Sequence, residues 1–378
     1  MKSSPLTLRS IVFVAVLAAA WNAAAFAASG TWTSAPSLHN ARDGHTATLL
    51  PNGNVVVAGG ENNNAAMTST EVYSPTFNSW TVSGNLNVAR SNAGAMLLPN
   101  GSILIAGGCV GNCLGATTAT AELYNSVSAT WSRTASMLKA RTYFSMVRLA
   151  NGNVLVAGGC TALNANGCSG VTAAAEIYSS SSGKWTATGS MTAARGNLTA
   201  TLLPNGNVLV AGGINAAGNP LGTAELYNPT TGKWTATGKM ITARDEHTAV
   251  LLSTGKVLVA GGENAAGVTT SKTEIYSPST GKWTSTGNLN ASRLEHTCTM
   301  LANGNVLIAG GNNVTAGGTT VLSSAEIYNP ANGVWTSTGS MSSPRVGHSA
   351  TLLISGGVLA ASGSDANNDL ISAEIYNP

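Results

Sequence analysis

The stretch LPNGNVLVAGG, residues 203–213, decides the fold, and close copies of it recur along the chain. Residues 208–211 are a short, continuous apolar run, as expected of a strand covered on both faces. The Asn-Gly pair at 205–206 is typical of a two-residue hairpin turn, which needs positive φ angles. Residues 198–203 therefore predict the first strand of a hairpin, and the paired glycines at 212–213 end the second.

Two further strands complete the unit around this hairpin. Residues 224–227 (AELY) predict a third strand, and residues 228–232 (NPTTG) predict a turn into the fourth. The fourth strand carries Trp234 among alternating threonine and alanine residues, the composition of a half-exposed outer strand. Four antiparallel strands in about fifty residues make one blade of a β-propeller.

The unit occurs seven times. Its tryptophans stand between 48 and 54 residues apart, at Trp32, Trp80, Trp131, Trp185, Trp234, Trp283 and Trp335. Its tyrosines recur at a similar period, at Tyr73, Tyr124, Tyr178, Tyr227, Tyr276, Tyr328 and Tyr376. Such a repeat indicates a propeller or a solenoid, whose units bury their apolar faces against their neighbours.

The two ends of the chain complement one another. The last unit stops just after Tyr376, before its outer strand, whereas residues 31–33 (TWT) are an outer-strand fragment with no hairpin of their own. Pairing of the two would leave no open sheet edge. We therefore expect an all-β fold, a seven-bladed propeller closed by the N-terminal strand, which completes the last blade.

The repeat resembles the kelch motif. It combines a Gly-Gly pair, a Glu-x-Tyr strand, a Trp seven residues after the Tyr and an Arg ten residues after the Trp. The resemblance covers nearly all of residues 28–378 and implies a single kelch-type β-propeller, similar to exported bacterial kelch-repeat proteins. Some kelch-type propellers are copper-radical oxidases, which need a dedicated Tyr, a Cys cross-linked to a Tyr, and His ligands. Tyr143 is the one spare tyrosine here, so the resemblance does not extend to that chemistry.

Residues 1–27 predict a signal peptide. Lys2 and Arg9 precede an apolar run at 11–20, and Ala25-Phe26-Ala27 offers small residues for cleavage after Ala27, or after Ala28 as the alternative. The run is about half as long as the roughly 20 residues that a membrane span needs. We therefore expect no membrane insertion and a secreted protein, extracellular or periplasmic, made of one domain at 28–378.

Four loop cysteines favour an oxidising compartment. They follow the Gly-Gly pairs of two neighbouring units, and disulfides within each loop, with cross-pairing between the loops as the alternative, would join Cys109, Cys113, Cys160 and Cys168. No His accompanies them at ligand spacing, so a metal site is not expected there. Cys298 takes the place that Ala47 fills in the first unit, which predicts a buried small apolar residue.

Several charged positions belong to the repeat. Every unit has one Arg and one Glu, and seven copies of such a pair favour buried ion pairs of the scaffold over acid–base chemistry. Four units also place a His three residues after the Arg, at His45, His247, His296 and His348. Shared metal binding is conceivable, but the regular spacing favours a structural role.

Eight acidic residues lie outside the repeat, in loops of units 1, 5, 6 and 7, which are contiguous in a closed ring. These loops and the loops after each Gly-Gly pair share the face with most sequence variation, where binding residues usually lie. The eight are Asp43, Glu61, Asp245, Glu246, Glu263, Glu295, Asp365 and Asp369. The first six form the predicted ligand site.

The favoured function is a non-catalytic binding propeller that recognises a protein or glycan partner through this acidic rim, with or without a divalent cation. The alternative is a sugar-active enzyme (glycan hydrolase, lyase or epimerase) that uses the same carboxylates. A third reading is a surface or matrix component without a small ligand. The net charge of +3 and the lack of a basic stripe argue against nucleic acid. No cofactor is expected, and we expect a monomer.

Overall fold

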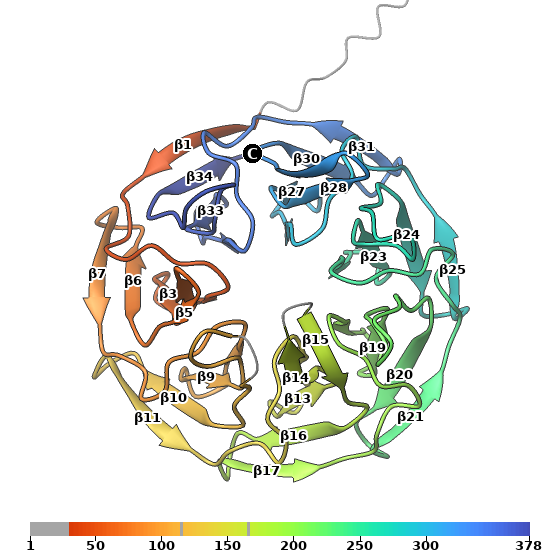
Figure 1. The fold of residues 1–378 in the computed structure, drawn as a ribbon, viewed down its shortest axis with the longest axis horizontal. Helices are drawn as coiled ribbons and strands as arrows, with labels where there is room; N and C mark the ends of the chain where they lie inside the picture. Colours follow the sequence, from red (N-terminus) through yellow and green to blue (C-terminus); the bar gives the residue numbers. More distant parts are fainter. Residues whose placement is uncertain (1–29, 114–115, 165–166) are drawn as a thin grey trace, which may run out of the picture.

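The computed structural model describes residues 30–113, 116–164 and 167–378, and the predicted signal peptide lies outside them. Viewed down its axis, the protein is a closed ring of seven four-stranded antiparallel sheets around a central channel (Figure 1). The predicted all-β, seven-bladed propeller is confirmed. The described part of the chain holds no helix of the length and apolarity that a membrane crossing requires.

Each blade lists from its innermost to its outermost strand. Blades 1 to 4 are β2 (Thr46–Leu49), β3 (Val55–Ala58), β6 (Thr70–Ser74), β7 (Ser79–Ser83); β8 (Gly94–Leu97), β9 (Ile103–Ala106), β10 (Ala121–Asn125), β11 (Thr130–Thr134); β12 (Ser145–Arg148), β13 (Val154–Ala157), β16 (Ala175–Ser179), β17 (Lys184–Ala187); and β18 (Thr199–Leu202), β19 (Val208–Ala211), β20 (Ala224–Asn228), β21 (Lys233–Ala236). Blades 5 to 7 are β22 (Thr248–Leu251), β23 (Val257–Ala260), β24 (Thr273–Ser277), β25 (Lys282–Ser285); β26 (Thr297–Met300), β27 (Val306–Ala309), β30 (Ala325–Asn329), β31 (Val334–Ser337); and β32 (Ser349–Leu352), β33 (Val358–Ala361), β34 (Ala373–Asn377), β1 (Thr31–Ala35). Three small hairpins lie in the loops: β4 (Glu61–Asn62) with β5 (Ala65–Ala66), β14 (Cys160–Asn164) with β15 (Gly167–Val171), and β28 (Asn312–Thr315) with β29 (Gly318–Val321).

The turn between β18 and β19 differs from the expected two-residue turn. Gly206 has a positive φ of 83°, but Asn205 does not, so the mirror-image turn that needs both is absent from this hairpin. Leu203 N donates to Asn207 O, and Gly206 N donates to Leu203 O, which encloses three residues. Pro204 explains the difference, because its fixed negative φ suits the first position of a type I turn followed by a left-handed glycine.

The N-terminal strand closes the ring, as predicted. β1 pairs antiparallel with β34, and Trp32 lies opposite Tyr376 in the register that Trp234 and Tyr227 share in blade 4. Trp32 Nε1 also donates to Gly339 O of the preceding blade at 2.8 Å. Segments more than 300 residues apart thus form one sheet (Figure 1).

The hydrophobic core is divided among the seven interfaces between blades. Between blades 3 and 4, for example, Leu155 and Ala157 pack against Val208, Val210 and Trp234, all of them buried. Each Tyr–Trp pair stacks within its blade, with ring centroids between 4.9 and 5.2 Å apart. Because each apolar face is covered only by the next blade, the ring is stable only when it is closed.

A buried ion pair braces every blade. In blade 5, Arg244 Nη2 donates to Glu274 Oε1 at 2.7 Å, and Nη1 donates to the carbonyl oxygens of Gly261 and Lys272. Glu274 Oε2 accepts a hydrogen bond from Ile241 N. The same pairing recurs in all seven blades with every arginine fully buried, so the structural interpretation of these charges is confirmed.

Candidate functional site

A ring of seven equivalent residues surrounds one end of the channel, each placed two residues after the buried arginine of its blade. All seven adopt left-handed backbone conformations, with φ between 49° and 62°. Backbone hydrogen bonds join neighbouring members, for example Asn92 N to Gly44 O at 2.8 Å and Asn197 N to Tyr143 O at 3.0 Å. We call this set the mouth ring; its members are Gly44, Asn92, Tyr143, Asn197, Glu246, Glu295 and Gly347.

The conformation of the mouth ring is costly for several of its members. Glycine and asparagine tolerate a positive φ, whereas tyrosine and glutamate rarely adopt it. Tyr143, Glu246 and Glu295 nevertheless do so, at 49°, 50° and 51°. Strain of about 1–3 kcal/mol per residue is typical of functional positions that the surrounding structure holds in place.

Carboxylates and a tyrosine from different blades converge at the mouth ring. Burial, together with the charges of Glu295, Asp245 and Glu263, raises the pKa of Glu246 well above its usual value. Burial also raises the pKa of Glu295, although solvent still reaches this side chain at the open end of the channel. The pKa of Tyr143 is raised by burial and by the charges of four carboxylates, Glu295, Glu61, Glu246 and Asp43.

Two carboxylate pairs flank the ring. Asp43 forms an isolated β-bridge with Glu61 in blade 1, and Asp245 forms the equivalent bridge with Glu263 in blade 5. Burial and repulsion from Glu61 raise the pKa of Asp43 to about 7. Burial and repulsion from Glu263 raise the pKa of Asp245 to about 7 as well. At neutral pH each pair is therefore poised to lose or gain a proton.

A small polar recess lies where blades 7 and 1 meet. Its volume is about 240 Å³, and Asp43 and Glu61 line it together with loop residues 364–369. Asp369 Oδ2 accepts a hydrogen bond from Asn63 N at 2.9 Å, which joins the two blades. Asp365 is used locally, because its Oδ1 accepts hydrogen bonds from Asn367 N and Asn368 N of its own loop.

The acids at this end of the channel have no basic partner. Within residues 30–113, 116–164 and 167–378, the ion pairs use only the Glu of each repeat. Three buried carboxylate oxygens also have no hydrogen-bond partner there: Asp43 Oδ1, Glu61 Oε2 and Asp245 Oδ1. The most buried of these residues is Asp245, which is 5% exposed. The site is therefore an uncompensated negative region.

The loop disulfides form the opposite wall of the mouth. Cys109 pairs with Cys113 and Cys160 with Cys168, so the predicted pairing within each loop is confirmed. Cys109, Cys160 and Leu163 form a small buried cluster, against which Tyr143 packs. This cluster holds the tyrosine side chain in its place beside the carboxylates.

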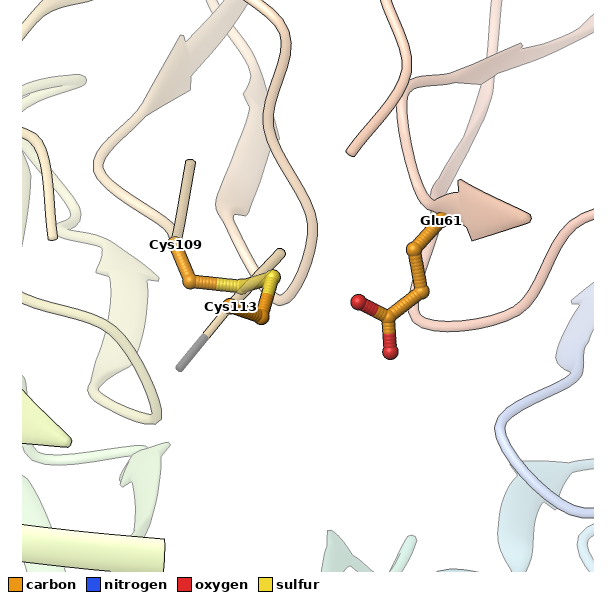
Figure 2. A group of neighbouring side chains, drawn as sticks. All are labelled: Glu61, Cys109 and Cys113. Atoms are coloured by element: carbon orange, nitrogen blue, oxygen red, sulfur yellow. A yellow bond between two sulfur atoms is a disulfide. The ribbon is translucent and has the colours of Figure 1, made fainter. Parts of the chain in front are cut away.

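Glu61 lies beside one of these disulfides. Its carboxylate points toward the Cys109 and Cys113 sulfur atoms, and the three ligand-type atoms lie within 4.8 Å of one another (Figure 2). This is the one group of three such side chains within metal-binding distance in the described part of the chain. Metal ions bind the thiolate form of cysteine, so two sulfurs bonded to each other do not provide that site.

The four repeat histidines join neighbouring blades. His247 Nε2 bonds to Thr199 Oγ1 at 3.0 Å and His296 Nε2 to Thr248 Oγ1 at 2.8 Å, each on the inner strand of the preceding blade. His45 and His348 make the same contact with Ser349 and Thr297. Burial lowers the pKa of His247 to about 3, so the ring is neutral at physiological pH. Each histidine serves the interface between blades.

All six predicted site residues lie at the same end of the channel, in two groups. Asp43 and Glu61 line the recess of blade 1, whereas Asp245, Glu246, Glu263 and Glu295 belong to blades 5 and 6. The sequence reasoning missed Asn92 and Asn197 and gave Tyr143 no role. Their shared position, two residues after each repeat arginine, is the signal that could have identified them.

Cys298 differs from its prediction. It lies on the inner strand β26 and is partly rather than fully buried, because inner strands line the channel. Burial of its thiol still raises its pKa to about 12, so the thiol is protonated at neutral pH.

Comparisons with known proteins agree with the architecture. Residues 145–363 match the family model of the KLHDC2/KLHL20/DRC7 kelch-repeats domain, and residues 45–87 and 90–138 match that of the kelch motif. No curated protein sequence matches the chain significantly. A similar solved structure is a fungal alcohol oxidase of the AA5 family in complex with copper, with a TM-score of 0.73, 18% identity, and coverage of 92% of this chain and 76% of that one. At this identity, the likeness concerns the fold alone.

Proposed function

The chain belongs to the kelch-repeat family of β-propellers, and from that premise we propose that it binds a protein or glycan partner through the mouth ring and the acidic loops around it. A kelch propeller suggests a binding or interaction role. The observation that carries this proposal is the collection of uncompensated carboxylates from blades 1, 5 and 6 around one end of the channel.

The scaffold suits binding because it is rigid where the loops are anchored. Each loop leaves a blade beside a fully buried Arg–Glu pair, such as Arg244–Glu274. Backbone hydrogen bonds between mouth-ring residues join one blade to the next. A preorganised surface loses little conformational entropy on association, which favours affinity.

The charge pattern favours recognition by electrostatic complementarity. Carboxylates at the end of a channel have low-dielectric walls around them, which concentrates their field. Asp43 and Asp245 are ionised only in part near pH 7, since their pKa values lie near 7. A partner with positive or hydrogen-donating groups would stabilise their charged forms.

Secretion is part of the proposal. Its support is the signal-peptide pattern at residues 1–27 and the two loop disulfides, which are typical of an oxidising compartment. The measurement that checks it is the N-terminal sequence of the protein recovered outside the cytoplasm of its expression host. A start at Ala28 or Ser29 is expected, and retention of residues 1–27 would contradict secretion.

Binding can be tested with arrays of oligosaccharides and of peptides of all charge types. We expect ligands that the wild type retains to be lost when Asp43, Glu246 and Glu295 are all changed to Lys. A second variant with Asn, Gln and Gln at the same positions controls for misfolding, and circular dichroism and melting temperature verify both. Ligand binding that survives both variants would show that this end of the channel is not the site.

A sugar-active enzyme is the second candidate, favoured by one observation. Asp43 and Asp245 each have a raised pKa and face a second carboxyl group, an arrangement that suits a general acid beside a base. Oligosaccharides that bind should then also be converted, and Asp245→Asn should abolish turnover while leaving binding intact. Unchanged oligosaccharides after prolonged incubation with the wild type would eliminate this candidate.

A further inference from the structure

We propose that the mouth ring binds an organic cation with several N–H donors, the guanidinium or ammonium group of a basic peptide side chain or of a polyamine, between Glu246 and Glu295. The inference rests on the proposed function and specifies the chemistry of its ligand. It follows from a local excess of hydrogen-bond acceptors over donors on one side of the channel.

The two glutamates are neighbours in the ring and are poorly supplied with donors. Glu295 N donates to Glu246 O at 3.2 Å, which places the residues side by side. Asn197 Nδ2 donates to Glu246 Oε1 at 3.1 Å, and Asn312 Nδ2 donates to Glu295 Oε2 at 3.4 Å. A carboxylate offers about four acceptor sites, so one amide contact leaves most of them open.

Asp245 adds an unsatisfied acceptor behind this pair. It is 5% exposed, and its Oδ1 has no hydrogen-bond partner among the described residues. Its charge also acts on Glu246, and the amide of Asn197 reaches both Asp245 and Glu246. A buried acceptor without a donor is unfavourable, and an N–H group from a ligand would satisfy it.

The spacing of these carboxylates favours an organic cation over a bare metal ion. A divalent ion requires several ligand atoms to converge within about 2.0–2.6 Å of one point. Within the part of the chain that the structure describes, Glu61 with Cys109 and Cys113 is the group that meets a three-ligand distance test, and the acids of blades 5 and 6 do not. A guanidinium group spreads five N–H donors over several ångströms and can reach separated carboxylates.

Tyr143 offers an apolar wall for the rest of the ligand. It comes from blade 3, packs against Cys109 and Cys160, and lies within the electrostatic reach of Glu246 and Glu295. Aromatic faces attract cations, and the aliphatic stem of a basic side chain packs well against such a surface. Asn92 Nδ2 donates to Tyr143 Oη at 3.2 Å and fixes the orientation of the ring.

Isothermal titration calorimetry at low salt can test this site with four probes: N-acetyl-arginine amide, spermidine, calcium chloride and neutral cellotetraose. The two organic cations should bind the wild type, and Glu246→Gln and Glu295→Gln should each weaken them by about tenfold or more. Asp365→Asn is the matched control. It removes the same charge from an exposed loop and keeps the oxygen that caps Asn367 and Asn368, so affinity should change less than about twofold.

Tyr143 and the source of the cation have their own arms. Tyr143→Leu should weaken both cations several-fold, whereas Tyr143→Phe, which keeps the ring, should not. Tighter binding of the arginine amide than of spermidine assigns the site to a peptide side chain, and the reverse order assigns it to a polyamine.

Several results would overturn the inference. If calcium or cellotetraose binds in a manner sensitive to Glu246→Gln and the organic cations do not, the ligand class is wrong while the proposed function stands. If the cations bind but only Asp365→Asn weakens them, the location is wrong. If no organic cation binds, the inference fails, and the array experiment with the triple Lys variant decides the proposed function independently.

Discussion

Replacing Asp245 by Asn should stabilise the protein at alkaline pH and have little effect at acidic pH. Asp245 is 5% exposed, and burial followed by repulsion from Glu263 raises its pKa from 3.8 to about 7. Below pH 3.8 the folded and unfolded states both hold the proton, so ionisation of Asp245 contributes nothing. Above pH 7 both states have lost it, and the folded state bears the unfavourable buried charge.

The size of the effect follows from proton linkage. A shift of about three pKa units corresponds to about 4 kcal/mol, at about 1.4 kcal/mol per unit. Between these two pKa values the folded state binds more protons than the unfolded state, so the wild type loses stability as the pH rises. The advantage of Asp245→Asn should therefore grow by about 3 kcal/mol between pH 5 and pH 8.5.

Urea denaturation of wild type and variant at both pH values measures this difference directly. Asp365→Asn is the control, since hydrogen bonds from Asn367 and Asn368 lower the pKa of that exposed group and its charge is the same at both pH values. An advantage of Asp245→Asn that is equal at pH 5 and pH 8.5 would refute the reasoning. It would mean that Asp245 is ionised normally in the folded state.

Three further predictions concern the scaffold. Burial lowers the pKa of His348 from 6.5 to about 3, so its contribution is complete above pH 6.5 and is lost as the pH falls toward 3; His348→Gln should lessen this acid sensitivity by up to about 1.4 kcal/mol per pH unit, and urea titrations at pH 6.5 and pH 4.5 that show parallel losses would contradict it. Trp234→Ala should cost about 3–5 kcal/mol in the free energy of unfolding, because Trp234 is 9% exposed and its Nε1 donates to Gly189 O, whereas the neighbouring exposed Thr235→Ala should stay within about 0.5 kcal/mol. Deletion of residues 31–34 removes most of β1 and should lower the melting temperature in calorimetry; an unchanged melting temperature would show that pairing with β34 does not hold the ring closed.

The repeat made most of the architecture readable from the sequence. Because each blade is a local unit of about fifty residues, hydrophobic pattern and turn residues predicted the blades without knowledge of the ring. The positions of Trp32 and Tyr376 predicted the closure, and the short separations of the loop cysteines favoured the pairing that the structure has. The identical Arg–Glu pairs were interpretable because seven copies cannot each be an active site.

The candidate site depended on the tertiary structure. Tyr143 and Glu295 are far apart in the sequence and come from different blades, and they meet only because seven blades close around one channel. Pattern and composition placed the acids on one face, but they could not show which carboxylates would lose solvent or repel one another. Those properties, which raise the pKa values of Asp43, Asp245 and Glu246, arise from burial and distance across blade interfaces. Local sequence determines the blade, whereas the closure of the ring determines which residues share the mouth of the channel.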